Sequence, residues 1–258
     1  MMNILVNADD FGISDDVNRA IDFCFLNNYI DRASLMVNMP GVKNAIELAK
    51  KNNYMDKINL HLNLIEGEPL TDEIKDTAFC VDGKFNSLFL KNTKNRLFIN
   101  KTTGNAVEKE MHAQIQAFKD YGFDVIRLDS HEHSHTSWSI LKILLRNWDK
   151  YGISELRLSR NIPSNEMVGL KGIYKKICNK FIIKKNSKGC VAPMNLITLF
   201  GSQDDIEKEL RVKHYGLHNA ELMIHPTMTN EKLKDVFNAC NIEQWITHNK
   251  CMFTRLHK

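Results

Sequence analysis

The chain has 258 residues, of which 43% are hydrophobic and 26% charged, and its formal net charge at pH 7 is +4. This is the composition of a globular protein, and the length suits a single α/β barrel. The net charge is too small to argue for a nucleic-acid partner. No apolar run approaches the roughly 20 residues that a membrane helix needs, so we expect no membrane partner either.

The six cysteines form no C-x-x-C pair and fit no zinc module. In a chain of this length they are expected to be reduced thiols, which predicts a cytoplasmic protein, with disulfides as the alternative. The N-terminus predicts no signal peptide, because a short apolar run at residues 4–6 leads straight into Ala8-Asp9-Asp10.

Short apolar runs alternate along the chain with longer segments of helical periodicity. The predicted strands lie at residues 4–6, 33–37, 58–62, 124–129, 155–158, 194–198 and 220–225. The predicted helices lie at residues 15–28, 41–52, 105–121, 137–150, 203–213 and near 230–249. About seven strand–helix units imply a parallel sheet with crossover helices. We expect a TIM-like (β/α) barrel of seven or eight parallel strands, with an open doubly wound sheet as the alternative.

Two segments depart from this alternation. Residues 64–103 are polar and irregular, which indicates an insertion. Residues 160–190 are basic, and apolar residues alternate with lysines between 171 and 188, which predicts an amphipathic helix with a solvated face. A lid over the active site or a contact with an anionic surface is the alternative. The chain shows no repeat or linker, so we expect one domain over residues 1–258.

Polar clusters follow four of the predicted strands. They are residues 7–12, His61 with Asn63, residues 129–135, and His225 with Pro226. In barrels and open α/β sheets alike, sites are built at the carboxyl ends of the strands. We therefore expect these four clusters to form one site.

The residue types in these clusters indicate metal chemistry. Asp9 and Asp10 follow an apolar strand, where two unpaired carboxylates would be costly and a divalent cation would relieve their repulsion. The alternative is that one of them caps the next helix. Three histidines fall within residues 131–135, and two histidines with a carboxylate are a common hydrolytic zinc set. The alternatives are an exposed polar loop for these three, and packed structural histidines for His61 and His225.

Together the four clusters resemble the YdjC-like family of carbohydrate deacetylases. The matching stretches are Asn7-Ala8-Asp9-Asp10-Phe11-Gly12, Leu60-His61-Leu62-Asn63-Leu64, Asp129-Ser130-His131-Glu132-His133-Ser134-His135 and Glu221-Leu222-Met223-Ile224-His225-Pro226. Two positions depart from the family pattern: Glu132 stands where Gln, Lys or His is common, and Thr227 stands where Gly is usual.

The resemblance implies a TIM-like barrel that binds one divalent metal, zinc or magnesium, through Asp10, His61 and His131. It implies Asp9 as the catalytic base and His225 as the residue that helps to protonate the leaving group. Further candidates for orienting the ligands or touching the substrate are Asn63, Ser130, Glu132 and His133.

The predicted function is metal-dependent removal of acetyl groups from N-acetylated amino sugars or oligosaccharides. The expected partner is a small carbohydrate substrate, and a homodimer is an open alternative to a monomer. Two other functions compete with this one: a metal-dependent phosphoesterase on a similar barrel, and a non-catalytic protein that binds metal or sugar. Phosphate chemistry usually recruits two metals and more carboxylates than the sequence offers.

Overall fold

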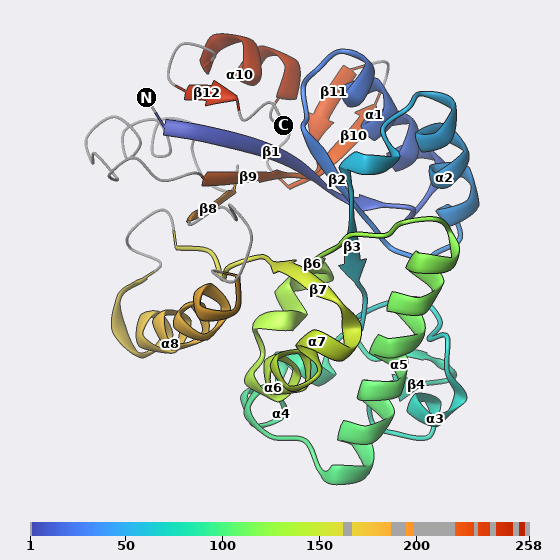
Figure 1. Cartoon of the computed structure of the whole chain (residues 1–258), viewed down its shortest axis with the longest axis vertical. Coiled ribbons are helices and arrows are strands. Elements are labelled where there is room, and N and C mark those ends of the chain that lie inside the picture. Colours follow the sequence, from blue (N-terminus) through green and yellow to red (C-terminus); the bar gives the residue numbers. More distant parts are fainter. Residues whose placement is uncertain are drawn as a thin grey trace.

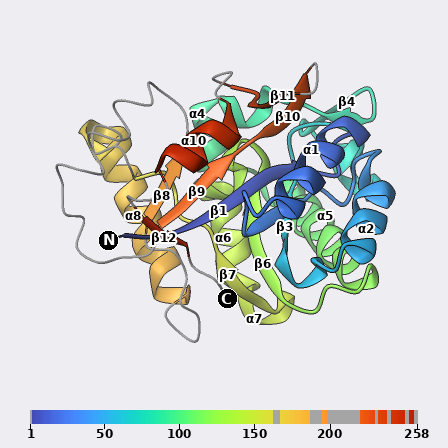
Figure 2. The ribbon, with the colours of Figure 1, turned by 90° about the horizontal axis from the view of Figure 1, so that it is seen from above.

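A curled parallel β-sheet forms the centre of the fold (Figures 1 and 2). The structure is a computed structural model that describes residues 2–161, 167–186, 195–198, 220–229, 232–237, 241–249 and 253–255. The sheet strands are β1 (Met2–Phe11), β2 (Arg32–Leu35), β3 (Ile58–Leu62), β6 (Ile126–Ser130), β7 (Ile153–Leu156), β8 (Asn195–Thr198), β9 (Ala220–Ile224) and β12 (Phe253–Arg255). Their order is β7-β6-β3-β2-β1-β9-β8, and β12 pairs with the first residues of β1. Every pair in this sheet is parallel, which confirms the expected α/β class.

A full TIM-like barrel of seven or eight strands, which the sequence predicted, is not shown. The strand order runs from β7 to β8, and within the described residues no pairing joins these two ends. The parallel strands curl around the core and form a partial barrel. Strand–helix alternation is common to closed and open parallel sheets, so the sequence pattern alone does not decide closure.

Helices connect the strands and cover the sheet. The longer ones are α1 (Asp15–Leu26), α2 (Val42–Lys51), α5 (Lys101–Asp120), α6 (Trp138–Arg146), α8 (Gly169–Asn186) and α10 (Ile242–Asn249), with short turns at η1 (Met55–Lys57), η3 (His131–Thr136) and α7 (Trp148–Tyr151). The hydroxyl of Ser14 accepts a hydrogen bond from the Val17 N–H and caps α1, which carries Ile21 and Cys24 into the core. Before this helix, Gly12 has a φ of +91°, and a Cβ there would lie 2.9 Å from the Met36 carbonyl oxygen. This position therefore needs glycine.

The predicted insertion lies between β3 and α5, at the bottom of Figure 1. It contains short elements of its own: α3 (Asp72–Lys75), β4 (Cys80–Val81), β5 (Lys84–Phe85), η2 (Phe89–Lys91) and α4 (Thr93–Leu97). Phe79, Phe85 and Leu90 are buried in the hydrophobic core cluster. The buried Glu110 of α5 accepts hydrogen bonds from the Leu70 and Thr71 N–H groups, which ties the insertion to the helix.

The helix predicted near residues 230–249 is wrong at residues 232–235. β10 (Pro226–Thr229) and β11 (Lys232–Asp235) form an antiparallel hairpin there, and the helix α10 begins at Ile242. Exposure alternates along β11, with Leu233 and Asp235 buried, as in a strand with one covered face. The helix predicted at residues 203–213 lies outside the described residues.

Within the basic segment, Gly169–Asn186 forms the expected helix α8, but this helix exposes apolar as well as charged residues. Leu170 is 86% exposed and Ile173 54%, whereas Cys178 and Ile182 are buried. None of the helices in the described parts of the chain has both the length and the apolar character of a membrane span. Three cysteines in these parts are free and buried: Cys24, Cys80 and Cys178.

Candidate metal centre

The sheet brings the polar clusters together at one edge. Because β6, β3, β2, β1 and β9 are neighbours in that order, their carboxyl ends lie side by side. His61 pairs in register with Asp129, and Ala8 pairs with Ile224, so Asp9 and His225 follow two paired residues. The expectation of a single site at the carboxyl ends of the strands therefore agrees with the geometry.

Three of the predicted residues converge on one point. The Asp10 Oδ1 atom lies 3.2 Å from His61 Nε2 and 2.8 Å from His131 Nδ1. One ligand atom from each of the three residues lies within 4.8 Å of the others. Asp10 has a φ of 67°, and the register of β1 against β2 shifts between Ala8 and Phe11. This irregularity turns Asp10 toward the two histidines, as β-bulges commonly do beside sites.

The donor set fits a divalent metal ion. One carboxylate and two imidazoles match the ligands of hydrolytic zinc sites. Each imidazole also bonds to a second carboxylate through its other nitrogen: His61 Nδ1 lies 2.6 Å from Asp129 Oδ1, and His131 Nε2 lies 3.1 Å from Glu66 Oε1. Such pairs are typical around metal-binding histidines, because they fix the tautomer and the ring orientation.

The electrostatics of the site favour the protonated, charged forms of His61 and His131 and the ionised form of Asp10. Burial alone would lower the pKa of His61, but Asp129 and Asp10 outweigh it and raise this pKa to about 10. The pKa of His131 likewise rises to about 9, because hydrogen bonds with Asp10 and Glu66 overcome burial. Burial would raise the pKa of Asp10, yet its two histidine partners hold it well below the ordinary value. A divalent cation bound here would take the place of protons on the two rings.

A buried arginine that was not predicted holds the other acidic residues. Arg157 follows β7, and its Nη1 and Nη2 atoms lie 2.7 and 2.8 Å from the two oxygens of Asp9. Nη2 also lies 2.5 Å from Asp129 Oδ2, and Nε lies 2.7 Å from Glu221 Oε1. The arginine side chain is 2% exposed. A charged residue between the apolar residues Leu156 and Leu158 was the signal in the sequence, because buried arginines are almost always paired.

Asp9 is therefore fixed in place beside the Asp10 triad. It also accepts a hydrogen bond from Asn7 Nδ2 at 2.8 Å. Burial would raise its pKa, but Arg157 and then His61 lower it far below the ordinary value, so the carboxylate stays ionised. Asp9, His61 and Asp129 form a second group with metal-compatible spacing. In that group both carboxylates already bind Arg157, whereas the Asp10 triad is free of this cation.

His225 lies at the end of β9, close enough to Asp9 for its charge to lower the pKa of that carboxyl. The backbone N–H of His225 donates to Asp235 Oδ2 at 2.8 Å, and the ring Nδ1 atom lies 3.9 Å from the same oxygen. The ring meets Phe237 edge to face, with 4.4 Å between the ring centroids. Its side chain is 12% exposed, so it is neither a fully buried core residue nor a free surface group.

The remaining predicted residues lie near the site without contacting the triad in the structure. Ser130 Oγ lies 2.6 Å from His135 Nδ1 and accepts the His135 N–H, so Ser130 orients His135 rather than a residue of the triad. Glu132 is exposed, and its carboxylate lies 3.9 Å from Lys91 Nζ. Burial lowers the pKa of His133 well below its usual value, and its Nδ1 atom has no hydrogen-bond partner in the described residues.

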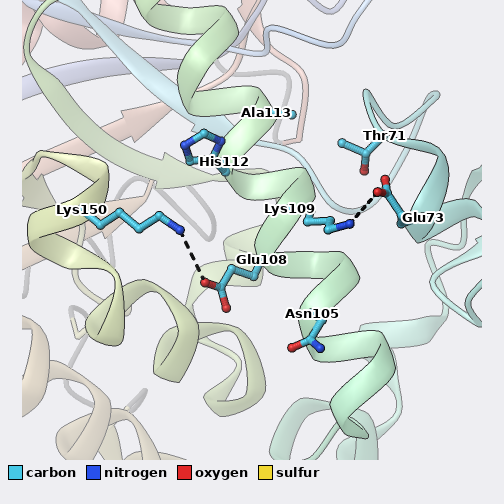
Figure 3. A pocket seen from close by; sticks show the side chains of 8 residues that line it. All are labelled: Thr71, Glu73, Asn105, Glu108, Lys109, His112, Ala113 and Lys150. Carbon is cyan, nitrogen blue, oxygen red and sulfur yellow. Dashed lines mark hydrogen bonds and ion pairs between the residues drawn. The ribbon is translucent and has the colours of Figure 1, made fainter.

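Two of the cavities formed by the described residues lie outside the triad. The larger, about 570 Å³, lies between the insertion and α5 and contains the ion pairs Lys109–Glu73 and Lys150–Glu108 (Figure 3). None of the predicted site residues lines it. The smaller, about 130 Å³, is lined partly by Ile65 and by Glu132 and Ser134 of the loop that follows His131. Of these two cavities, the smaller is therefore the one formed in part by the loop that carries His131.

Comparison with known proteins agrees with the geometry. A family model described as YdjC-like protein matches residues 3–251. A carbohydrate deacetylase of Clostridium beijerinckii is 27% identical over 256 residues, covering 94% of this chain and 97% of the relative. A carbohydrate deacetylase of Thermoanaerobacter pseudethanolicus is 24% identical, covering 92% of this chain and 85% of the relative.

A solved structure shares the fold. It is that of a candidate cellobiose-phosphate cleavage protein from Enterococcus faecalis, with a TM-score of 0.66 at 18% identity, and the match covers 98% of this chain and 97% of that one. The family match extends over nearly the whole sequence and includes the four strand-end clusters. The chain belongs to the YdjC-like protein family.

Proposed function

We propose that this protein is a metal-dependent carbohydrate deacetylase that hydrolyses the acetamide group of N-acetylated amino sugars or oligosaccharides. The observation that carries the proposal is the convergence of Asp10, His61 and His131, with Asp9 held beside them by Arg157. The two curated relatives described above carry the name carbohydrate deacetylase.

Asp10, His61 and His131 would hold the metal. When bound there, a divalent metal lowers the pKa of a coordinated water and polarises the acetyl carbonyl. Two imidazole nitrogens with one carboxylate suit zinc better than magnesium, which prefers oxygen ligands. Zinc is therefore our first choice, with magnesium, manganese and cobalt as alternatives.

Asp9 is the proposed general base. Its carboxylate is ionised and buried, and Arg157 donates two hydrogen bonds to it, so its orientation is set before the substrate arrives. Its role is to take a proton from the water that attacks the acetyl carbon. An amine leaves only after it gains a proton, and His225, at the end of the neighbouring strand, is the proposed donor.

The small cavity beside the loop 131–137 is the proposed place for the rest of the sugar. It is lined by Ile65, Ser87, Leu90, Lys91, Arg96, Glu132, Ser134 and Ser137. The Ser134 hydroxyl is buried and has no hydrogen-bond partner among the described residues. A buried polar atom without a partner is costly, and the hydroxyl groups of a sugar would satisfy it.

The phosphoesterase alternative fits the site less well. Two-metal phosphate chemistry needs a second cation site. Within the part of the chain that the structure describes, the second metal-compatible group shares His61 and has both carboxylates bound to Arg157. A non-catalytic binding protein would not need a carboxylate oriented beside the metal centre. A homodimer and a cytoplasmic location stay predictions, which size-exclusion chromatography and cell fractionation test.

The proposal is tested by measuring acetate release. The protein is stripped of metal with a chelator and reloaded separately with zinc, magnesium, manganese or cobalt. N-acetylglucosamine, its N-acetylated dimer and longer oligomers are then supplied as substrates. We expect acetate from at least one sugar with at least one metal, and none from the His61→Ala variant. Metal and glycan binding without acetate would indicate a binding protein, and phosphate release from phosphoesters alone would indicate a phosphoesterase.

A further inference from the structure

The two histidines of the candidate metal centre present different nitrogens to Asp10. His61 places Nε2 3.2 Å from Asp10 Oδ1 and Nδ1 2.6 Å from Asp129. His131 places Nδ1 2.8 Å from the same Asp10 oxygen and Nε2 3.1 Å from Glu66. Each ring thus lies between Asp10 and a second carboxylate. His61 directs Nε2 toward Asp10, whereas His131 directs Nδ1 toward it.

The turn that carries Glu66 is built to hold it there. Asn63 Oδ1 accepts the N–H groups of Ile65 and Glu66, and Asn63 Nδ2 donates to the Glu66 carbonyl. The buried Gln114 of α5 in turn bonds to both the N–H and the carbonyl of Asn63. The predicted site residue Asn63 therefore acts on the site through the position of Glu66.

We propose that Glu66 is a positioning residue for the metal centre, one that accepts the Nε2–H of His131 and so directs Nδ1 toward the metal. Asp129 accepts the Nδ1–H of His61, so that His61 binds the metal through Nε2. This inference rests on the proposed metal site and adds to it a residue outside the predicted set.

The carboxylates of Asp129 and Glu66 differ in how much the stability of the fold depends on them. Asp129 is 3% exposed and also bonds to Ser34 and Arg157, so its removal disturbs the buried ion network. The Glu66 side chain is 42% exposed. The ion pair with His131 is the one charged interaction of its carboxylate among the described residues. Changing Glu66 is therefore expected to alter metal binding without unfolding the protein.

The first test compares zinc affinity in variants of the full chain by competition with a chromophoric chelator. Partners of metal-bound histidines typically contribute about 10- to 100-fold in metal affinity, so we expect Glu66→Gln to bind zinc about 10- to 100-fold more weakly. Glu66→Ala should lose at least as much, and Glu66→Asp, which keeps the charge, should lose less. Glu68→Gln is the matched control, since Glu68 is an exposed carboxylate two residues further along the same loop. It should bind zinc as the wild type does.

The second test observes the rings directly. Long-range ¹⁵N–¹H spectra of the zinc-loaded protein should show His61 protonated at Nδ1 and His131 protonated at Nε2. Wild-type zinc affinity in Glu66→Gln, or both rings protonated at the same nitrogen, would overturn the inference. A wild-type chain that binds no divalent metal would overturn the inference and the metal site together. Zinc binding without acetate release would refute the proposed function and leave the role of Glu66 intact.

Discussion

Replacing Arg157 by methionine removes the guanidinium group that bonds to Asp9, Asp129 and Glu221. The substitution leaves a side chain of similar length in the interior and three buried carboxyl groups without their cation. Removing one partner of a buried ion pair typically costs about 3–5 kcal/mol. Because natural domains are stable by about 5–15 kcal/mol, we expect Arg157→Met to lose a large fraction of the free energy of unfolding.

The loss should depend on pH in a definite direction. Burial is the largest influence on the pKa of Asp9, and it acts upward, while Arg157 provides the strongest opposing effect. Without the arginine, the pKa of Asp9 in the folded protein should rise above its value in the unfolded chain. An acid of this kind destabilises the fold increasingly as pH rises, by about 1.4 kcal/mol for each unit of pKa shift. Across the range pH 4–8, the stability difference between the variant and the wild type should therefore be smallest at pH 4 and largest at pH 8.

Urea unfolding followed by circular dichroism measures this loss. If the free energy of unfolding depends equally steeply on urea concentration in both proteins, their unfolding midpoints can be compared directly. Glu221→Gln is the matched control from the same cluster. Burial raises the pKa of Glu221 to about 7. Because this raised pKa means that Glu221 holds less of its charge at neutral pH than Asp9 does, the control should cost less stability than Arg157→Met. A loss below about 1 kcal/mol in Arg157→Met, or a loss that does not vary with pH, would refute the reasoning.

Three further predictions concern the site itself. Asp9→Asn should keep bound metal but lose about 10²–10⁴-fold in turnover, whereas Asp10→Asn should weaken metal binding. Elemental analysis measures the bound metal and acetate release measures the turnover. The reverse pattern would exchange the roles of the two residues. Because the pKa values of His61 and His131 are raised to about 10 and 9, metal must displace protons from both rings, so metal affinity should increase with pH by up to roughly 100-fold per unit near pH 7. Chelator competition at several pH values measures this slope, and an affinity that is constant with pH would contradict it. His225→Ala should slow amide hydrolysis about 10²–10⁴-fold but affect an activated ester far less, since nitrophenolate leaves without a proton; equal losses on both substrates would make His225 a packing residue.

Much of the fold and the three residues of the triad could be predicted from the sequence. The alternation of apolar runs with helical periodicity is a local property, and it indicates a parallel sheet with crossover helices. In such a sheet the residues after each strand meet at one edge. That rule predicted one site for the four polar clusters, and the resemblance to the YdjC-like family then singled out Asp10, His61 and His131 as the metal ligands.

Local patterns failed where the outcome depended on a neighbour in space. Lys232–Asp235 forms a strand rather than the first part of the predicted helix, because it pairs with the extended segment Pro226–Thr229. Ser130, which adjoins His131 in the sequence, bonds to His135. Closure of the barrel depends on which strands pair at the two ends of the sheet, and strand spacing does not contain that information.

The amino-acid sequence by itself determined which chemistry this protein can offer: a carboxylate and two imidazoles at strand ends, within a parallel α/β framework. Only the tertiary structure decided how those groups are held. Arg157 lies 148 residues from Asp9 along the chain, and Glu66 reaches His131 from a turn anchored on α5. These contacts arise from strand order and from the burial of charges, which forces each ionised group to find a partner wherever the fold places one.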